Sequence, residues 1–263
     1  VIDGGRMVQI EPRNGITNPA KFKGYLEENK KIPLQLIQDD DAFNAARVSI
    51  GSMGIVYAVV LKADLKFWLR EVRTTTTCSA LTKPNGKLTR LLNGLPVNAE
   101  GSSPEHWELQ YSPYLNKDND HTFLITERYR VYSPLPEQQP LERGKPGTDF
   151  LSTLLTLRPV GTTAAGFLDL FPSLAKTLLE STLDAQQDDN FTNVSYKVFN
   201  VGVVNHTAAL ATETAFNINQ TISAIERSFD IAEQQFNAGR VHSAPVAIRF
   251  VKKTDALIAM QNG

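Results

Sequence analysis

The sequence predicts an α+β fold, in which a small mixed α/β part at residues 1–63 precedes a large antiparallel sheet at residues 64–263. Two observations lead to this class. In the first part, short segments in which apolar and polar residues alternate are separated by short helical segments, which is typical of a mixed α/β arrangement. In the second part, most segments alternate apolar and polar residues and are joined by turn-rich stretches, which favours antiparallel strands covered by helices on one face.

Capping residues and alternation define the elements of the first part. Asn18 is placed to cap a helix that has a proline in its first turn and lysines near its end. Three consecutive aspartates, Asp39 to Asp41, cap a second and shorter helix. The expected elements are strands at residues 6–12 and 33–38, helices at residues 18–31 and 41–48, and a long strand that begins after residue 54.

The second part is dominated by strands. Two long alternating segments flank the turn-rich residues 115–120 and predict a hairpin. The expected strands are residues 65–75, 105–114, 121–133, 193–201, 207–218 and 244–252, and the expected helices are residues 79–94, with a break, 164–184 and 219–239. The proline-rich residues 133–149 predict a surface loop or lid.

Composition excludes several classes of function. The 27 basic and 28 acidic residues leave a formal net charge of −1. The sequence therefore lacks the excess of basic residues that is typical of nucleic-acid-binding proteins. One cysteine, Cys78, and four scattered histidines argue against a disulfide and against a bound metal. No apolar run is long enough to predict a transmembrane segment, and nothing in the sequence fixes the localisation.

The stretch SIGSMGIVYAVVL, residues 49–61, places Gly51 and Gly54 directly before a run of β-branched and apolar residues. Glycine is favoured where φ is positive or where another group approaches the backbone closely. The spacing fits neither the dinucleotide fingerprint nor the phosphate-binding loop. A β-bulge or a tight turn is the alternative explanation for the two glycines.

Residues 39–71 resemble the segment that closes the flavin-binding domain of the vanillyl-alcohol-oxidase-like flavoproteins. The matching positions are Phe43, Ala45, Ala46, Val48, Ser49, Gly51, Gly54, Ile55 and Val56. The resemblance implies that FAD lies beside this turn and that Ser49, Gly51, Ser52, Gly54 and Ile55 contact it. The chain would then contain the end of a flavin-binding domain, residues 1–63, and a ferredoxin-like substrate-binding cap, residues 64–263.

A weaker similarity extends to two later residues. Glu213 matches a strand glutamate of this family, and Arg249 matches an arginine that faces flavin and substrate in alditol and aldonolactone oxidases. Ala247 stands where those enzymes have a glutamate, and this departure leaves a polyol, a lactone or a sterol-like substrate open. Arg249 is the expected catalytic residue, and Glu213 and Arg249 are the expected substrate-binding residues. The alternative for Arg249 is an arginine that faces solvent on the surface of the sheet.

The resemblance implies an FAD-dependent oxidoreductase that oxidises a small alcohol by hydride transfer to flavin. The implied partners are the alcohol and the remainder of the flavin domain, and the formation of a homo-oligomer is left open. The rival hypothesis is a non-catalytic ferredoxin-like module for binding or dimerisation, which uses no cofactor.

Three other features have alternative explanations. The aspartates at residues 39–41 are explained either by a divalent cation or by helix capping. His242 is either an active-site base or a surface histidine. Arg128 and Arg130 share one face of a strand and form either an anion site or a solvated edge of the sheet, and we expect the solvated edge.

Overall fold

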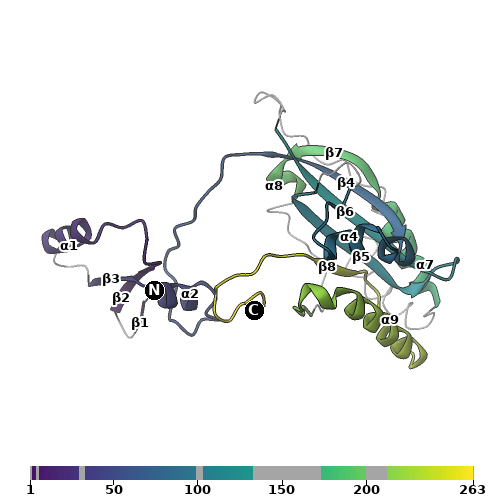
Figure 1. Cartoon of the computed structure of the whole chain (residues 1–263). Coiled ribbons are helices and arrows are strands. Elements are labelled where there is room, and N and C mark those ends of the chain that lie inside the picture. Colours follow the sequence, from purple (N-terminus) through teal and green to yellow (C-terminus); the bar gives the residue numbers. More distant parts are fainter. Residues whose placement is uncertain are drawn as a thin grey trace, which may run out of the picture. The chain divides into compact units, whose positions relative to one another are not determined.

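The computed structural model divides the chain into two compact units, and each is described separately (Figure 1). The first unit comprises Val1–Asp64 and Val251–Gly263, and the second comprises Leu65–Phe250. Residues 251–263, which were expected in the second part, therefore pack with the first. The structure describes residues 2–3, 6–29, 33–98, 103–132, 173–199 and 212–262.

The first unit contains a three-stranded sheet and two short helices. The strands lie in the order β1, β2, β3; β1 pairs with β2 antiparallel, and β2 pairs with β3 parallel. As predicted, Asn18 caps α1 by accepting a hydrogen bond from Lys21 N–H, and Asp39 caps α2 by accepting one from Ala42 N–H. The elements are β1 (Ile2–Asp3), β2 (Arg6–Glu11), α1 (Pro19–Glu28), β3 (Leu34–Gln38) and α2 (Asp40–Arg47).

This first unit has almost no core of its own. Among its described residues only Glu11 and Ala256 are buried. Neither α1 nor α2 buries a side chain completely. Since burial of apolar surface is the main stabilising term in folding, the unit is expected to be weakly stable in isolation.

The second unit is built on a five-stranded sheet in which every pairing is antiparallel. The strands lie in the order β7, β4, β6, β5, β8, so β6 is central and β8 lies at one edge. The prediction of a large antiparallel sheet is confirmed. The strands are β4 (Trp68–Thr77), β5 (His106–Leu115), β6 (His121–Val131), β7 (Asp188–Val194) and β8 (Val246–Arg249).

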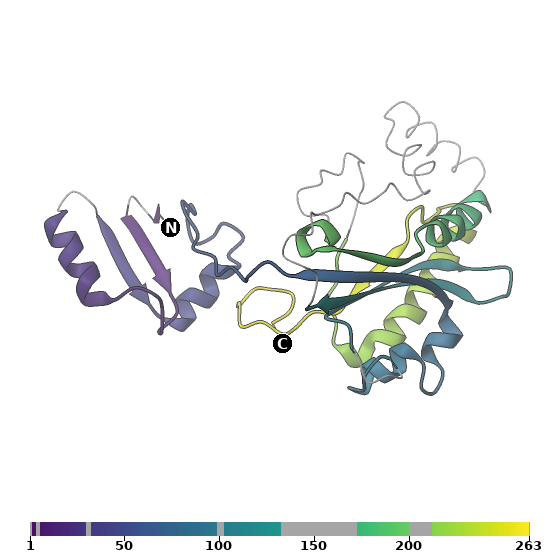
Figure 2. The same ribbon diagram turned by 90° about the horizontal axis from the view of Figure 1, so that it is seen from above.

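Helices lie on both faces of this sheet, whereas the sequence predicted helices on one face (Figure 2). Leu81, Leu88 and Ile225 pack from α3, α4 and α9 against the apolar face that carries Trp107 and Phe123. On the opposite face, α7 contacts β5 and β6, and α8 follows β7. The helices are α3 (Cys78–Thr82), α4 (Lys87–Leu92), α7 (Ser173–Ala185), α8 (Ser195–Val198) and α9 (Thr221–Asn237), which a 3₁₀ turn at Ile218–Gln220 precedes.

Three expected strands differ from the structure. Residues 56–67 have no regular structure, because no described strand pairs with them. Residues 195–198 form α8 instead of continuing a strand, and residues 212–217 form no strand. The remainder of the expected strand at 207–218, and the predicted lid at 133–149, lie outside the described residues.

Candidate functional site

The two glycines lie in a tight turn between α2 and the residues that lead to the second unit. Ser52 donates two hydrogen bonds to the carbonyl oxygen of Ser49, from its N–H at 2.8 Å and from its Oγ at 2.6 Å. The φ angles of Gly51 and Gly54 are 76° and 99°, and that of Ile50 is 49°. Positive φ is the region that glycine tolerates best, so the backbone geometry accounts for the residue type at both glycines.

The turn is open on the side where a side chain at Gly51 would project. A Cβ built on Gly51 meets no atom within 4 Å. Gly51 and Ser52 are exposed, and Ile55 keeps 72% of its surface exposed. Of the five expected cofactor-binding residues, Gly51, Ser52 and Ile55 are exposed, whereas Ser49 and Gly54 are half-buried.

A groove of about 350 Å³ lies beside the end of α2, within the first unit. Arg47 and Val48 line one side, and residues between Val251 and Gln261 line the other. A hydrogen bond from Leu257 N–H to the carbonyl oxygen of Asn44, 3.2 Å long, ties this C-terminal segment to α2. Arg47 and Lys252 place two exposed cations in the groove, which suits an anionic group.

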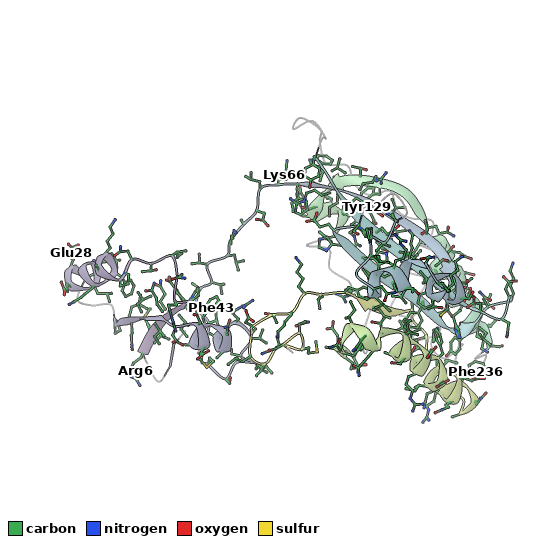
Figure 3. All side chains as sticks on the ribbon, viewed as in Figure 1. Arg6, Glu28, Phe43, Lys66, Tyr129 and Phe236 are labelled. Carbon is green, nitrogen blue, oxygen red and sulfur yellow. The ribbon has the colours of Figure 1, made fainter. Side chains whose placement is uncertain are left out.

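An exposed apolar segment, residues 55–61, follows the turn. Its large apolar side chains, together with that of Leu65 further on, are between 55% and 93% exposed: Ile55, Val56, Tyr57, Val59, Val60, Leu61 and Leu65. Figure 3 labels Phe43 on α2, before this segment, and Lys66 after it. Contiguous exposed apolar surface of this kind marks an interaction site in soluble proteins.

Arg249 lies on the edge strand β8 and is exposed. Val246, Ile248 and Phe250 pack against the apolar core, so Arg249 projects from the opposite face of the sheet. In the part of the chain that the structure describes, Arg249 makes no hydrogen bond and no ion pair. Its guanidinium is thus available to a ligand.

Glu213 is exposed and lies in irregular structure before α9. No hydrogen bond or ion pair joins it to Arg249 within the described residues. Their assignment as substrate-binding residues stays a prediction.

Sequence reasoning missed a set of charged residues on the face from which Arg249 projects. Arg128 lies on the central strand β6, and its side chain is only 12% exposed, so the expectation of a solvated sheet edge is wrong for Arg128. Its Nε donates to Oε2 of the fully buried Glu71 at 2.7 Å, and its Nη1 donates to Glu108 at 3.4 Å. The alternating charges in the sequences WLREVR and TERYR were the available signal.

The remaining candidates have structural explanations. Asp39 caps α2, and Asp40 accepts a hydrogen bond from Arg13 N–H at 2.8 Å. Among the described residues, no group of three or more acidic, histidine or cysteine side chains is arranged to hold a metal ion. His242 lies on an exposed loop and donates its backbone N–H to Tyr114 Oη at 2.7 Å.

Comparisons with protein-family models, with curated proteins and with solved structures gave no match to this chain. No helix in the described ranges combines the length and the apolar character that crossing a membrane requires.

Proposed function

We propose that the chain belongs to an FAD-dependent oxidoreductase that oxidises an alcohol by hydride transfer to flavin. The observation that carries the proposal is the open glycine turn with its left-handed backbone beside a groove that holds two cations. This arrangement supports binding of a cofactor that is flat, apolar at one end and anionic at its pyrophosphate.

The described residues fit FAD in three respects. Open space at Gly51 lets the backbone approach a ring system, and exposed backbone N–H groups of the turn can donate hydrogen bonds. Arg47 and Lys252 can pair with phosphate oxygens. The exposed apolar segment at residues 55–61 supplies surface for the ring system and for the remainder of a flavin domain.

Bound flavin supplies the hydride acceptor for this reaction. Oxidation of an alcohol carbon also requires that a base accepts the hydroxyl proton and that the oxygen is held as negative charge develops on it. The free guanidinium of Arg249 can donate two parallel hydrogen bonds to such an oxygen or to an adjacent polar group. In this proposal Arg249 orients the alcohol.

The turn is tested by replacing Gly51 with alanine and measuring FAD affinity from the quenching of flavin fluorescence. We expect Gly51→Ala to weaken FAD binding by about tenfold or more, because the new Cβ occupies space reserved for the cofactor.

Gly239→Ala is the matched control. Gly239 has the same φ of 76° and equally open surroundings, but it lies at the end of α9 in the second unit. We expect FAD affinity to be unchanged in this variant. Equal losses in both variants would assign the effect to backbone strain and remove the turn from the cofactor site.

A second candidate function is the non-catalytic ferredoxin-like module for binding or dimerisation, which the exposed apolar segment also favours. The same titration separates the two functions. A protein that binds no FAD yet forms a concentration-dependent dimer in sedimentation would be such a module.

A further inference from the structure

Strand β3 forms an open edge of the sheet in the first unit. Among the described strands it pairs only with β2, on one side. Met7 N–H donates to the carbonyl oxygen of Pro33 at 3.3 Å, so every second residue from Pro33 onward directs its backbone groups toward β2. The residues between these direct their N–H and C=O groups to the open side: Leu34, Leu36 and Gln38. Unpaired groups of this kind form a template for a further strand.

A mostly apolar groove of about 430 Å³ lies between α1 and this edge strand. Phe22 and Leu26 line it from α1. Leu34 and Leu36 line it from β3. All four side chains are only half-buried. A strand that pairs with the open edge of β3 would place every second side chain on the same face as Leu34 and Leu36, beside this groove.

The exposed apolar segment, residues 55–61, has the composition of a strand. Its sequence, IVYAVVL, is apolar at every position and rich in β-branched residues, which is typical of a strand that is buried on both faces. Residues 56–61 nevertheless form no strand, and the large apolar side chains of the segment are between 55% and 83% exposed. Pairing of residues 56–61 with another strand would therefore break no existing β-ladder.

Each chain thus presents a strand-like segment that no described strand pairs with, and an open strand edge with a groove beside it. The segment does not pair with β3 of its own chain. A second copy of the chain presents the same two features. Two chains that exchange their segments would cover both edges at once, in a closed two-fold arrangement such as most homodimers adopt.

The number of residues involved indicates the strength of such a dimer. Stable interfaces bury about 800 Å² on each partner, from roughly 20–30 residues. The seven residues of the segment and the eight that line the groove are fewer than this. The arrangement is therefore suited to a weak dimer with a dissociation constant in the micromolar range.

We propose that residues 55–61 of one copy add a strand to the open edge of β3 in a second copy, and that the exchange is reciprocal and forms a homodimer. This inference does not rest on the proposed function, although that function places flavin against the same segment. Dimerisation is therefore measured without FAD. The FAD titration of Gly51→Ala and Gly239→Ala decides separately whether flavin binds.

Val60→Asp tests the role of the segment in sedimentation experiments over a range of protein concentrations. We expect the parent to dimerise with a dissociation constant of about 1–100 μM. We expect Val60→Asp to weaken dimerisation about tenfold or more, because an unpaired carboxylate is costly to bury between strands. Val60 is 80% exposed, so the substitution should leave the fold intact, and circular dichroism checks this.

Ile16→Asp is the matched control. Ile16 is 81% exposed and belongs to the same unit, but it lies outside both the segment and the groove. We expect its dimerisation to equal that of the parent. A parent that remains monomeric at about 1 mM, or equal dimerisation of the Val60→Asp and Ile16→Asp variants, would overturn the inference.

Leu36→Pro tests the edge of β3, because it removes an N–H that points to the open side and retains the groups that face β2. We expect this variant alone to dimerise about tenfold more weakly or worse than the parent. A mixture with Val60→Asp should contain more dimer than either variant alone at the same total concentration, because an intact segment then meets an intact edge.

The mixing experiment requires that the variant edge remains folded. NMR signals of β2 and β3 check this for Leu36→Pro. If those signals are lost, Gln35→Lys takes its place, since Gln35 is exposed beside the groove and a lysine on an edge strand opposes pairing. A mixture that contains no more dimer than its separate components would show that the segment and the edge are not partners, and would overturn the inference.

Discussion

At the scale of single residues, Glu71 shows how this sheet tolerates charge in its interior. Its carboxylate is fully buried, and a guanidinium group meets each of its two oxygens. A buried charge is costly unless it is paired, and removal of one partner leaves the other charge uncompensated. The buried carboxylate of Glu71 therefore depends on both arginines.

We expect Glu71→Ala to lower the free energy of unfolding by about 3–5 kcal/mol, because it leaves Arg73 and Arg128 without their shared anion. Urea unfolding followed by tryptophan fluorescence measures this, since Trp68 and Trp107 both lie in the sheet. Glu105→Ala removes an exposed ion pair on the same sheet and should cost no more than about 1 kcal/mol. Equal losses of unfolding free energy in the two variants would contradict the view that burial makes the Glu71 ion pairs important for stability.

Glu11 plays a comparable part in the first unit, where the loop that follows β2 folds over it. Burial raises the pKa of Glu11, but hydrogen bonds from Thr17, Gln38 and Gln9 outweigh this and lower it from 4.5 to about 2. Gly15 is required in this loop, because a Cβ there would come within 2.6 Å of Glu11 Cβ.

The lowered pKa makes the first unit sensitive to acid. The ionised form of Glu11 contributes stability above pH 4.5, and this contribution is lost as the pH falls from 4.5 through about 2. We expect the dispersed NMR signals of β2 and β3 to collapse over this range in the parent. The first unit of the Glu11→Gln variant should be less stable than that of the parent at neutral pH, and its stability should depend less on pH. Signals that persist unchanged to pH 2 in the parent would contradict this assignment.

At the scale of elements, local signals in the sequence were sufficient where an element depends on its own residues. Caps at Asn18 and Asp39 mark the starts of α1 and α2, and both are formed as predicted. The broken helix that ends near Gly94 is confirmed as α3 and α4, with a φ of 67° at Gly94. Alternation likewise predicted the β5–β6 hairpin.

The sequence was insufficient where an element depends on distant partners. β4 pairs with β6 and β7, and no local pattern discloses that order, so Arg128 was expected at an edge and lies at the centre. Val194 ends a strand where alternation suggested that the strand continues, because a single helical turn, α8, starts at Ser195. The glycine turn was predictable from residue type, whereas the ion pair between Glu71 and Arg128 required the register of β4 and β6.

At the scale of the whole molecule, the two units differ in how much they bury. The second unit has an extensive apolar core between β5, β6 and α9, whereas the described part of the first unit contains only two buried residues. Two connections join the units, at residues 64–65 and 250–251. Since local stability follows buried apolar contacts, the two units should differ in stability within one chain.

Amide hydrogen exchange, with and without FAD, tests this difference. We expect amides of β2 and β3 to exchange roughly tenfold or more faster than those of β5 and β6, because opening of the first unit exposes little apolar surface. FAD that binds the folded first unit stabilises it by mass action, so it should slow exchange in β2, β3 and α2 and leave β5 and β6 unchanged. Residues 56–64, which have no regular structure, should gain protection only if the cofactor or another part of the protein covers them. Equal protection of both units without FAD would show that the first unit draws stability from contacts beyond its own few buried side chains.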